Sequence, residues 1–142
     1  MQIINKKRQK SCEVRLSVPF HDLDPMHMVF HANYLKYFDI ARFEIFNQAG
    51  IDLYEYFKKT KLLFPLTKTS TKHILPLRHR DEFICKATIT DARIILKMNF
   101  EIRRVLDNAV CARGKSDQVA VKHPKMEMMF EIPEDIRTAL GF

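Results

Sequence analysis

Apolar and polar residues alternate in one early stretch of the chain and repeat at helical spacing in the next. Residues 12–18 alternate between the two classes, which is typical of a half-buried β-strand, and Pro19 ends it. From Asn33 to Ala49 apolar residues recur every three or four positions, which predicts a helix that stops at Gly50. Most of this helix's circumference is apolar, so we expect other structure to cover it.

The remaining sequence predicts a short helix, four strands and a terminal helix. Residues 51–57 are predicted to be helical with Asp52 as the N-cap, followed by a charged turn over 58–61. Strands are predicted over 64–77, 82–91, 92–103 and 109–123, with Gly114 as a candidate bulge. The terminal helix is predicted over 133–140, with Pro133 in its first turn.

Together these elements predict an α+β fold. One antiparallel sheet of about five strands that curls round one long apolar helix accounts for the order of the elements, and this arrangement is the hotdog fold. The chain length of 142 residues corresponds to a single domain over 1–142. Residues 1–11 are polar and are expected to form a frayed N-terminal segment.

Composition and charge narrow the class of protein. Hydrophobic residues make up 46% and charged residues 29% of the chain, as in an ordinary soluble globular protein. Three separated cysteines without metal-like spacing favour a reduced, cytoplasmic protein. No apolar run approaches the roughly 20 residues that cross a bilayer, and no signal peptide is recognisable. The net charge of +7 favours an anionic partner without choosing among small molecules, acidic proteins and nucleic acids.

The candidate chemistry lies in residues 20–34. Asp22 and Asp24 are two residues apart, Asp24 precedes Pro25, and a loop rich in His and Met then leads to Asn33. Asn33 is predicted to be the helix cap, the alternative being a side chain that supports the site residues. A helix N-terminus presents unpaired backbone N–H groups that favour negative charge. A carboxylate beside such groups suits acyl transfer, because the N–H groups can stabilise the oxyanion that forms.

Five runs of residues resemble the 4-hydroxybenzoyl-CoA thioesterase family of hotdog acyl-CoA thioesterases. They are 22–25 (DLDP), 31–34 (HANY), 38–44 (FDIARFE), the turn 75–83 (LPLRHRDEF) and the tail 132–136 (IPEDI). The resemblance covers nearly the whole chain and is most specific over 20–44. It implies a hydrolase of acyl-CoA or acyl-carrier-protein thioesters that needs no cofactor. It also implies a homodimer or homotetramer with active sites at the subunit interface.

By this resemblance Asp24 is the catalytic carboxylate, and His31 stands at the helix entrance as the second catalytic residue. The backbone N–H groups of His31, Ala32 and Asn33 are the expected oxyanion site. The sequence leaves open whether Asp24 is a nucleophile or a general base, and whether His31 acts through its side chain or its backbone. Asp24 could instead be only an Asp-Pro turn former.

A substrate pocket is expected around the same loop, lined by Met26, His27, Met28, Phe30 and Tyr34. The family usually has a glycine at the position of His27 and small residues at positions 26 and 28. Asp22 is expected to be structural and bonded to loop N–H groups. The acyl group, the choice between CoA and carrier protein, and the choice between dimer and tetramer stay open.

Other functions were weighed against thioester hydrolysis. A metal site is disfavoured because the His and Asp residues of 21–31 match no strong metal motif. Binding of acyl thioesters without turnover is one alternative. A basic nucleic-acid-binding module is another, disfavoured because the basic residues are dispersed. Basic residues late in the chain could instead meet CoA phosphates or an acidic carrier protein, and residues 126–130 are expected in the core or an interface.

Overall fold

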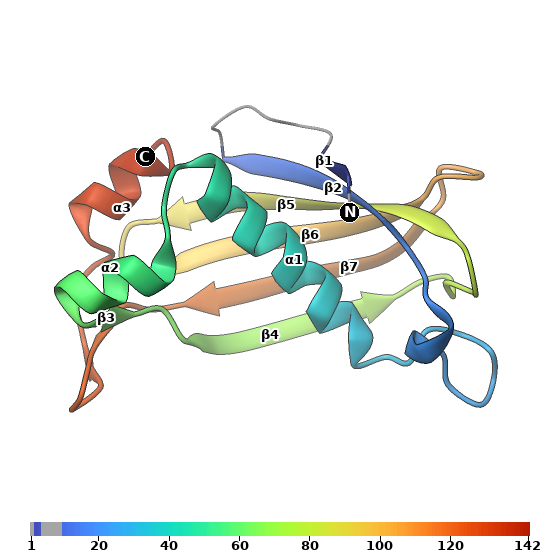
Figure 1. The fold of residues 1–142 in the computed structure, drawn as a ribbon, viewed down its shortest axis with the longest axis horizontal. Coiled ribbons are helices and arrows are strands. Elements are labelled where there is room, and N and C mark those ends of the chain that lie inside the picture. Colours follow the sequence, from blue (N-terminus) through green and yellow to red (C-terminus); the bar gives the residue numbers. More distant parts are fainter. Residues whose placement is uncertain (1, 4–9) are drawn as a thin grey trace.

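The computed structural model describes residues 2–3 and 10–142, which form an α+β structure in which a long helix crosses one face of an antiparallel sheet (Figure 1). The sheet has six strands in the order β1-β2-β5-β6-β7-β4, and each neighbouring pair is antiparallel. Its strands are β1 (Gln2–Ile3), β2 (Ser11–Ser17), β4 (Leu66–His73), β5 (Glu82–Ala92), β6 (Leu96–Arg104) and β7 (Val110–Gln118). The predicted antiparallel α+β architecture is confirmed.

The helices and a small second sheet complete the fold. The helices are α1 (Asn33–Gln48), α2 (Leu53–Thr60) and α3 (Glu134–Ala139), with a 3-10 turn η1 (Phe20–Asp22). The small sheet consists of β3 (Leu62–Leu63), β8 (Val121–Lys122) and β9 (Glu127–Met128). In Figure 1, α2, α3 and the small sheet lie together at one end of the molecule, while the loop before α1 lies at the other.

The apolar face of α1 packs against the inward-facing side chains of the sheet. Tyr37 and Phe38 are each 3% exposed, and the ring of Phe38 stacks on Phe100 of β6 with 4.7 Å between ring centroids. The ring of Tyr37 lies 4.8 Å from that of Phe83 on β5. Alternate residues of β5 and β6 are buried, as the period of two in the sequence predicts.

Gly114 shows why the predicted bulge in the last long strand is wrong. The pairing of β7 with β6 and with β4 passes through Gly114 without a register shift. A Cβ atom at this position would overlap the ring of Phe38. The glycine therefore makes room for α1 to lie close to β7.

Two predicted helix boundaries are corrected by the structure. Asp52 caps α2 as predicted, since its side chain accepts hydrogen bonds from Tyr54 N at 3.0 Å and Glu55 N at 3.1 Å. However, α2 continues through residues 58–60, where a turn was predicted; Lys58 and Lys59 in its last turn suit the negative end of the helix dipole. Pro133 is the N-cap of α3 and lies outside its first turn.

Two further predictions concern the N-terminal segment and the methionine-rich segment 126–130. Gln2–Ile3 pairs with β2, and Ser11 lies within β2; residues 1 and 4–9 of the expected frayed segment lie outside the described residues. The side chains of residues 126 and 128–130 are exposed, so the core alternative of their prediction is wrong, while the interface alternative stays a prediction. None of the described helices is long and apolar enough to span a membrane.

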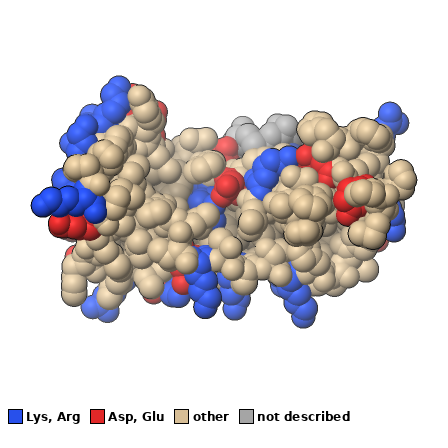
Figure 2. Space-filling model, turned by 90° about the horizontal axis from the view of Figure 1, so that it is seen from below, with Lys and Arg blue, Asp and Glu red and all other residues tan. Residues whose placement is uncertain are grey.

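The edge strand β4 has an open side. It pairs with β7 on one side, and no strand of the described residues pairs with its other side. Seven of its eight residues are exposed. Figure 2 looks onto this edge: most of it is uncharged, and Lys and Arg side chains project along one border. Such an edge presents unpaired N–H and C=O groups to any further strand.

Candidate active site

Asp24 begins a tight turn whose backbone it also stabilises. The N–H of His27 donates to the carbonyl of Asp24 at 3.0 Å, and Pro25 occupies the second position of the turn, which its fixed φ favours. The carboxylate oxygen Oδ1 of Asp24 accepts from Met26 N at 2.8 Å and from Met28 N at 3.3 Å. The turn role of Asp24 is therefore real, and it occupies only one of the two carboxylate oxygens.

His27 closes this turn in the left-handed region, with a φ of 62°. Glycine adopts that conformation at little cost, whereas an L-residue with a side chain is uncommon there. The turn is held on either side by the bond from Asp24 N to Met28 O, 2.8 Å, and by the bridge between Leu23 and Val29. The positive φ at this position therefore explains why the resembled family usually has a glycine there.

Asp22 supports the loop through hydrogen bonds from α1, and not through the loop N–H groups that were predicted to bond to it. Its buried carboxylate accepts from Lys36 Nζ at 2.6 Å and from Tyr37 Oη at 2.6 Å, both on α1. Among the described residues no loop N–H group bonds to it. Burial alone would raise the pKa of Asp22, but the hydrogen bonds from Lys36 and Tyr37 bring this pKa below its ordinary value. Asp22 thereby ties the loop to the first turns of α1.

Asn33 is not the cap of α1. The N-cap is Ala32, which has no side-chain capping bond, and the side-chain amide of Asn33 donates to Asp22 O at 2.9 Å. The backbone N–H of Asn33 donates to Phe30 O at 2.9 Å. No acceptor among the described residues bonds to the backbone N–H of His31 or Ala32, so these two donors are free.

A cavity of about 310 Å³ opens between this loop, the start of α1 and the end of β4. Its walls are formed by Asp24, Met26, Met28, Val29, His31, Tyr34, His73, Ile74, Leu75 and Pro76. Five residues singled out in the sequence thus meet here: Asp24, His31, Met26, Met28 and Tyr34. His27 and Phe30, expected to line the pocket, do not border it.

The contribution of residues 73–76 was not predicted from the sequence. His73 ends β4 and residues 74–76 follow it, and pairing of β4 with β7 fixes where this distant part of the chain lies. The buried ring of Tyr34 contacts the ring of His73 edge-on, with 4.8 Å between centroids. Burial raises the pKa of Tyr34, although its hydrogen bond to the backbone of Leu77 opposes this effect. The sequence signal that could have identified these residues was the turn 75–83, which resembles the family motif and whose first residues, Leu75 and Pro76, line the cavity.

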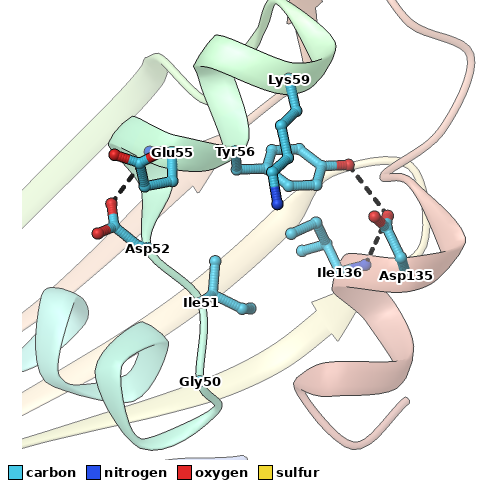
Figure 3. A pocket seen from close by; sticks show the side chains of 8 residues that line it. All are labelled: Gly50, Ile51, Asp52, Glu55, Tyr56, Lys59, Asp135 and Ile136. Carbon is cyan, nitrogen blue, oxygen red and sulfur yellow. Dashed lines mark hydrogen bonds between the residues drawn. The ribbon is translucent and has the colours of Figure 1, made fainter.

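Another cavity of about 310 Å³ lies at the opposite end of the molecule, between α2 and α3 (Figure 3). There Tyr56 donates a hydrogen bond to Asp135 at 3.0 Å and so joins the two helices. Asp52, as described, caps α2. Three polar side chains of this cavity, Asp52, Tyr56 and Asp135, are thus engaged in holding the helices.

Within residues 2–3 and 10–142 no group of His, Cys, Asp or Glu side chains is arranged to hold a metal ion.

The sequence was compared with models of protein families. Residues 18–140 match the model of the thioesterase-like superfamily. The chain belongs to the thioesterase-like superfamily. No curated protein matches the sequence.

Solved structures share the fold of this family member. A 4-hydroxybenzoyl-CoA thioesterase from Pseudomonas sp. strain CBS-3 has a TM-score of 0.83 and 17% identity, over 92% of this chain and 99% of that one. A 1,4-dihydroxy-2-naphthoyl-CoA thioesterase from Synechocystis has a TM-score of 0.82 and 17% identity, over 92% and 95%. A gentisyl-coenzyme A thioesterase has a TM-score of 0.77 and 23% identity, over 88% and 98%. These TM-scores show a common fold.

Proposed function

We propose that this protein is a single-domain hotdog thioesterase that hydrolyses an acyl-CoA. The observation that carries the proposal is one cavity bordered both by Asp24 and by His31, which precedes α1. The backbone N–H groups of His31 and of its neighbour Ala32 have no acceptor among the described residues. Membership of the thioesterase-like superfamily supports it.

The chemistry assigned to Asp24 follows from its hydrogen bonds. Its Oδ1 is occupied by the N–H groups of its own turn, which fix the direction of the carboxylate. Oδ2 has no partner among the described residues and is the oxygen that reacts. As a nucleophile, it would attack the thioester carbonyl carbon, expel the thiolate and form an anhydride that water hydrolyses. As a general base, it would take a proton from a water that attacks the same carbon.

The oxyanion that either route forms is assigned to the N–H groups of His31 and Ala32. A donor aimed at the developing charge contributes about 10²–10³ in rate. Asn33, part of the expected oxyanion site, is dropped from it because its N–H is bonded to Phe30. The imidazole of His31 lines the cavity and is assigned to orient the attacking water or to protonate the thiolate that leaves.

The named structural relatives favour an acyl-CoA, and the net charge favours an anionic carrier of either kind. The structural relatives named above are described as thioesterases of CoA esters. The net charge of +7 suits a carrier that bears phosphates. An acyl carrier protein, also acidic, is the second candidate for the carrier.

We further propose a homodimer formed through β4. Antiparallel pairing of β4 with β4 of a second copy would satisfy the open edge and extend the sheet across both chains. His73, the last residue of β4, and residues 74–76 after it would then lie at the subunit interface, together with the cavity that they line.

Asp24→Asn tests the proposal. Asparagine keeps an oxygen that can accept from Met26 and Met28, so the turn should persist, while the reactive carboxylate is lost. We expect the wild type to release thiol from at least one of a panel of aryl, short-chain and long-chain acyl-CoAs. We expect Asp24→Asn to lose about 10² or more of that rate, within the range for a general base.

Asp91→Asn is the matched control. Asp91 also accepts a bond from the N–H two residues on, Arg93 N at 3.0 Å, but it lies on the far strand β5. Its rate should equal that of the wild type. A wild type that binds the CoA esters yet cleaves none, on CoA or on a carrier protein, would instead identify a non-catalytic acyl-thioester-binding protein.

A further inference from the structure

The face of the large sheet that points away from α1 carries a hollow of about 380 Å³ over β4, β7 and β6. The side chains that border it on this face are polar or cationic: Ser70, Lys72, Asn99, Arg113 and Lys115. Phe100 and Gly114, which alternate with them along β6 and β7, face Phe38 of α1. The pairing of β4 with β7 places Ser70 and Lys72 on the same outer face as the two β7 cations.

The cations of this hollow outnumber the carboxylates beside them. Arg113 Nε lies 3.4 Å from one oxygen of Glu101, but the other oxygen of Glu101 accepts from Arg103 Nε at 2.6 Å. One carboxylate is therefore shared by two guanidinium groups. Lys72 and Lys115 form no ion pair within the described part of the chain. Four cations and one carboxylate leave a surplus of positive charge at the hollow.

Two of these cations are held directly opposite each other. Lys72 of β4 is the register partner of Arg113 of β7. Like charges at directly opposite positions of neighbouring strands destabilise a sheet, because their Cβ atoms are only about 4.5–5.5 Å apart. An anion bound between the two side chains would replace this repulsion with two charge-assisted hydrogen bonds.

The donors of the hollow match a phosphate group better than a carboxylate. One guanidinium and two ammonium groups surround the hydroxyl of Ser70 and the amide of Asn99, and each of these groups can donate hydrogen bonds. A phosphate group offers about two negative charges and at least three acceptor oxygens, whereas a carboxylate offers one charge and two oxygens. Phosphate therefore satisfies more of the donors and more of the surplus charge.

The sheet separates this hollow from the candidate active site. The ring of His73 contacts Tyr34 of α1 and lies on the α1 face, where both residues line the candidate cavity. Lys72, its neighbour in β4, lies on the opposite face. In the proposed dimer a second copy closes the edge of β4, so a substrate whose thioester lies at Asp24 has no route round that edge. The hollow therefore suits an anion other than the substrate.

We propose that this hollow binds a phosphate group of a small molecule other than the thioester substrate. Lys72, Arg113 and Lys115 hold the phosphate, and Ser70 and Asn99 complete its hydrogen bonds. The site lies within one chain, so its existence does not depend on the proposed thioesterase function. Inorganic phosphate and the phosphate ester of a nucleotide share this chemistry, and the experiment separates them.

Isothermal titration calorimetry of the full chain with inorganic phosphate, pyrophosphate and ADP tests the proposal. We expect the wild type to bind at least one of the three, and the tightest of them identifies an inorganic or a nucleotide phosphate as the ligand. Lys72→Gln and Lys115→Gln should each weaken this binding about tenfold or more, as the loss of a hydrogen bond to a charged group does. Lys115→Arg keeps the charge and should retain most of the affinity.

Lys125→Gln is the matched control. Lys125 is exposed in the turn between β8 and β9, outside the hollow, and this variant loses the same charge as Lys115→Gln. It should bind the probe as the wild type does. Equal weakening by Lys125→Gln and Lys115→Gln would show a general effect of net charge and overturn the proposal. Failure of the wild type to bind any of the three probes would also overturn it.

Thermal unfolding provides a readout that a merely structural role of Lys72 would not give. Because Lys72 faces Arg113, Lys72→Gln should unfold at the wild-type temperature or above it when no phosphate is present. The tightest probe should raise the unfolding temperature of the wild type and leave that of the double variant Lys72→Gln/Lys115→Gln unchanged. A double variant that responds to the probe as the wild type does would contradict the site.

Steady-state kinetics with an acyl-CoA distinguishes the proposed ligand from the substrate. The double variant should keep the wild-type KM, because the sheet lies between the hollow and Asp24. A KM raised about tenfold would assign the hollow to the phosphates of the substrate and overturn the proposal. If the wild type cleaves no thioester, the proposed function fails, whereas the calorimetry still decides whether the hollow binds phosphate.

Discussion

Asp22 is a buried carboxylate whose role is to hold the loop, and its partners determine how pH acts on it. Lys36 and Tyr37 both donate to it, and together they keep its pKa below the ordinary value. The folded state therefore binds this proton less readily than the unfolded state does. The stabilisation that Asp22 provides is complete above the unfolded pKa of about 3.9 and is lost as the pH falls through the lower folded value.

We therefore expect Asp22→Asn to lower the free energy of unfolding at pH 7 by about 1.5–3 kcal/mol, the range for hydrogen bonds to a charged group. The difference between wild type and variant should shrink as the pH falls below about 4, because Asp22 then becomes protonated, first in the unfolded and then in the folded wild type. Urea unfolding at several pH values measures it. A difference that is constant with pH would show that the charge of Asp22 contributes nothing.

At the scale of elements, the close approach of α1 to β7 depends on the pair Phe38 and Gly114. The ring of Phe38 occupies the space that a Cβ at Gly114 would fill, and the same ring stacks on Phe100. The helix is thus held at a distance from the sheet that only glycine in β7 allows. The distance also positions the start of α1 beside Asp24.

Gly114→Ala should accordingly destabilise the protein by about 1–3 kcal/mol, the usual cost of overpacking. Phe38→Leu shortens the ring and should make the alanine better tolerated, so the double variant should be more stable than the sum of the two single effects predicts. Thermal unfolding of the four proteins measures this coupling. Strict additivity would mean that the two residues do not meet.

At the scale of the whole molecule, the open edge of β4 presents backbone N–H and C=O groups that a second copy could bind. We expect the protein to sediment as a dimer. We also expect the backbone amides of β4 to exchange with solvent more slowly in the dimer than after dilution to the monomer. Thr69→Glu combined with Thr71→Glu places like charges across the two-fold axis and should weaken the dimer. Thr88→Glu on β5 is the control and should leave it intact. A monomer at all concentrations would contradict the proposed interface.

Local sequence pattern was sufficient for most of the fold. The spacing of apolar residues over 33–49 predicted α1, because one buried face of a helix needs that spacing. Alternation predicted β5 and β6, which bury one face. Asp52 was recognised as a cap because its side chain accepts bonds from backbone N–H groups only two and three residues further along the chain. Each of these features depends on near neighbours in the chain.

The candidate site was predictable only in part, for the same reason. Asp24, Met26 and Met28 belong to one local turn, and their sequence showed it. Asn33 was misjudged because its amide bonds to Asp22, eleven residues earlier, and the partners of Asp22 lie fourteen and fifteen residues later on α1.

The sequence by itself determined the main helices and strands, the family and the loop that carries Asp24. Only the tertiary structure decided that His73 joins this loop, that Gly114 receives Phe38, and that Lys72 lies opposite Arg113. The residues brought together in this way are between 39 (Tyr34 and His73) and 76 (Phe38 and Gly114) positions apart. Such contacts follow from the strand order of the sheet, which no local pattern of apolar and polar residues specifies.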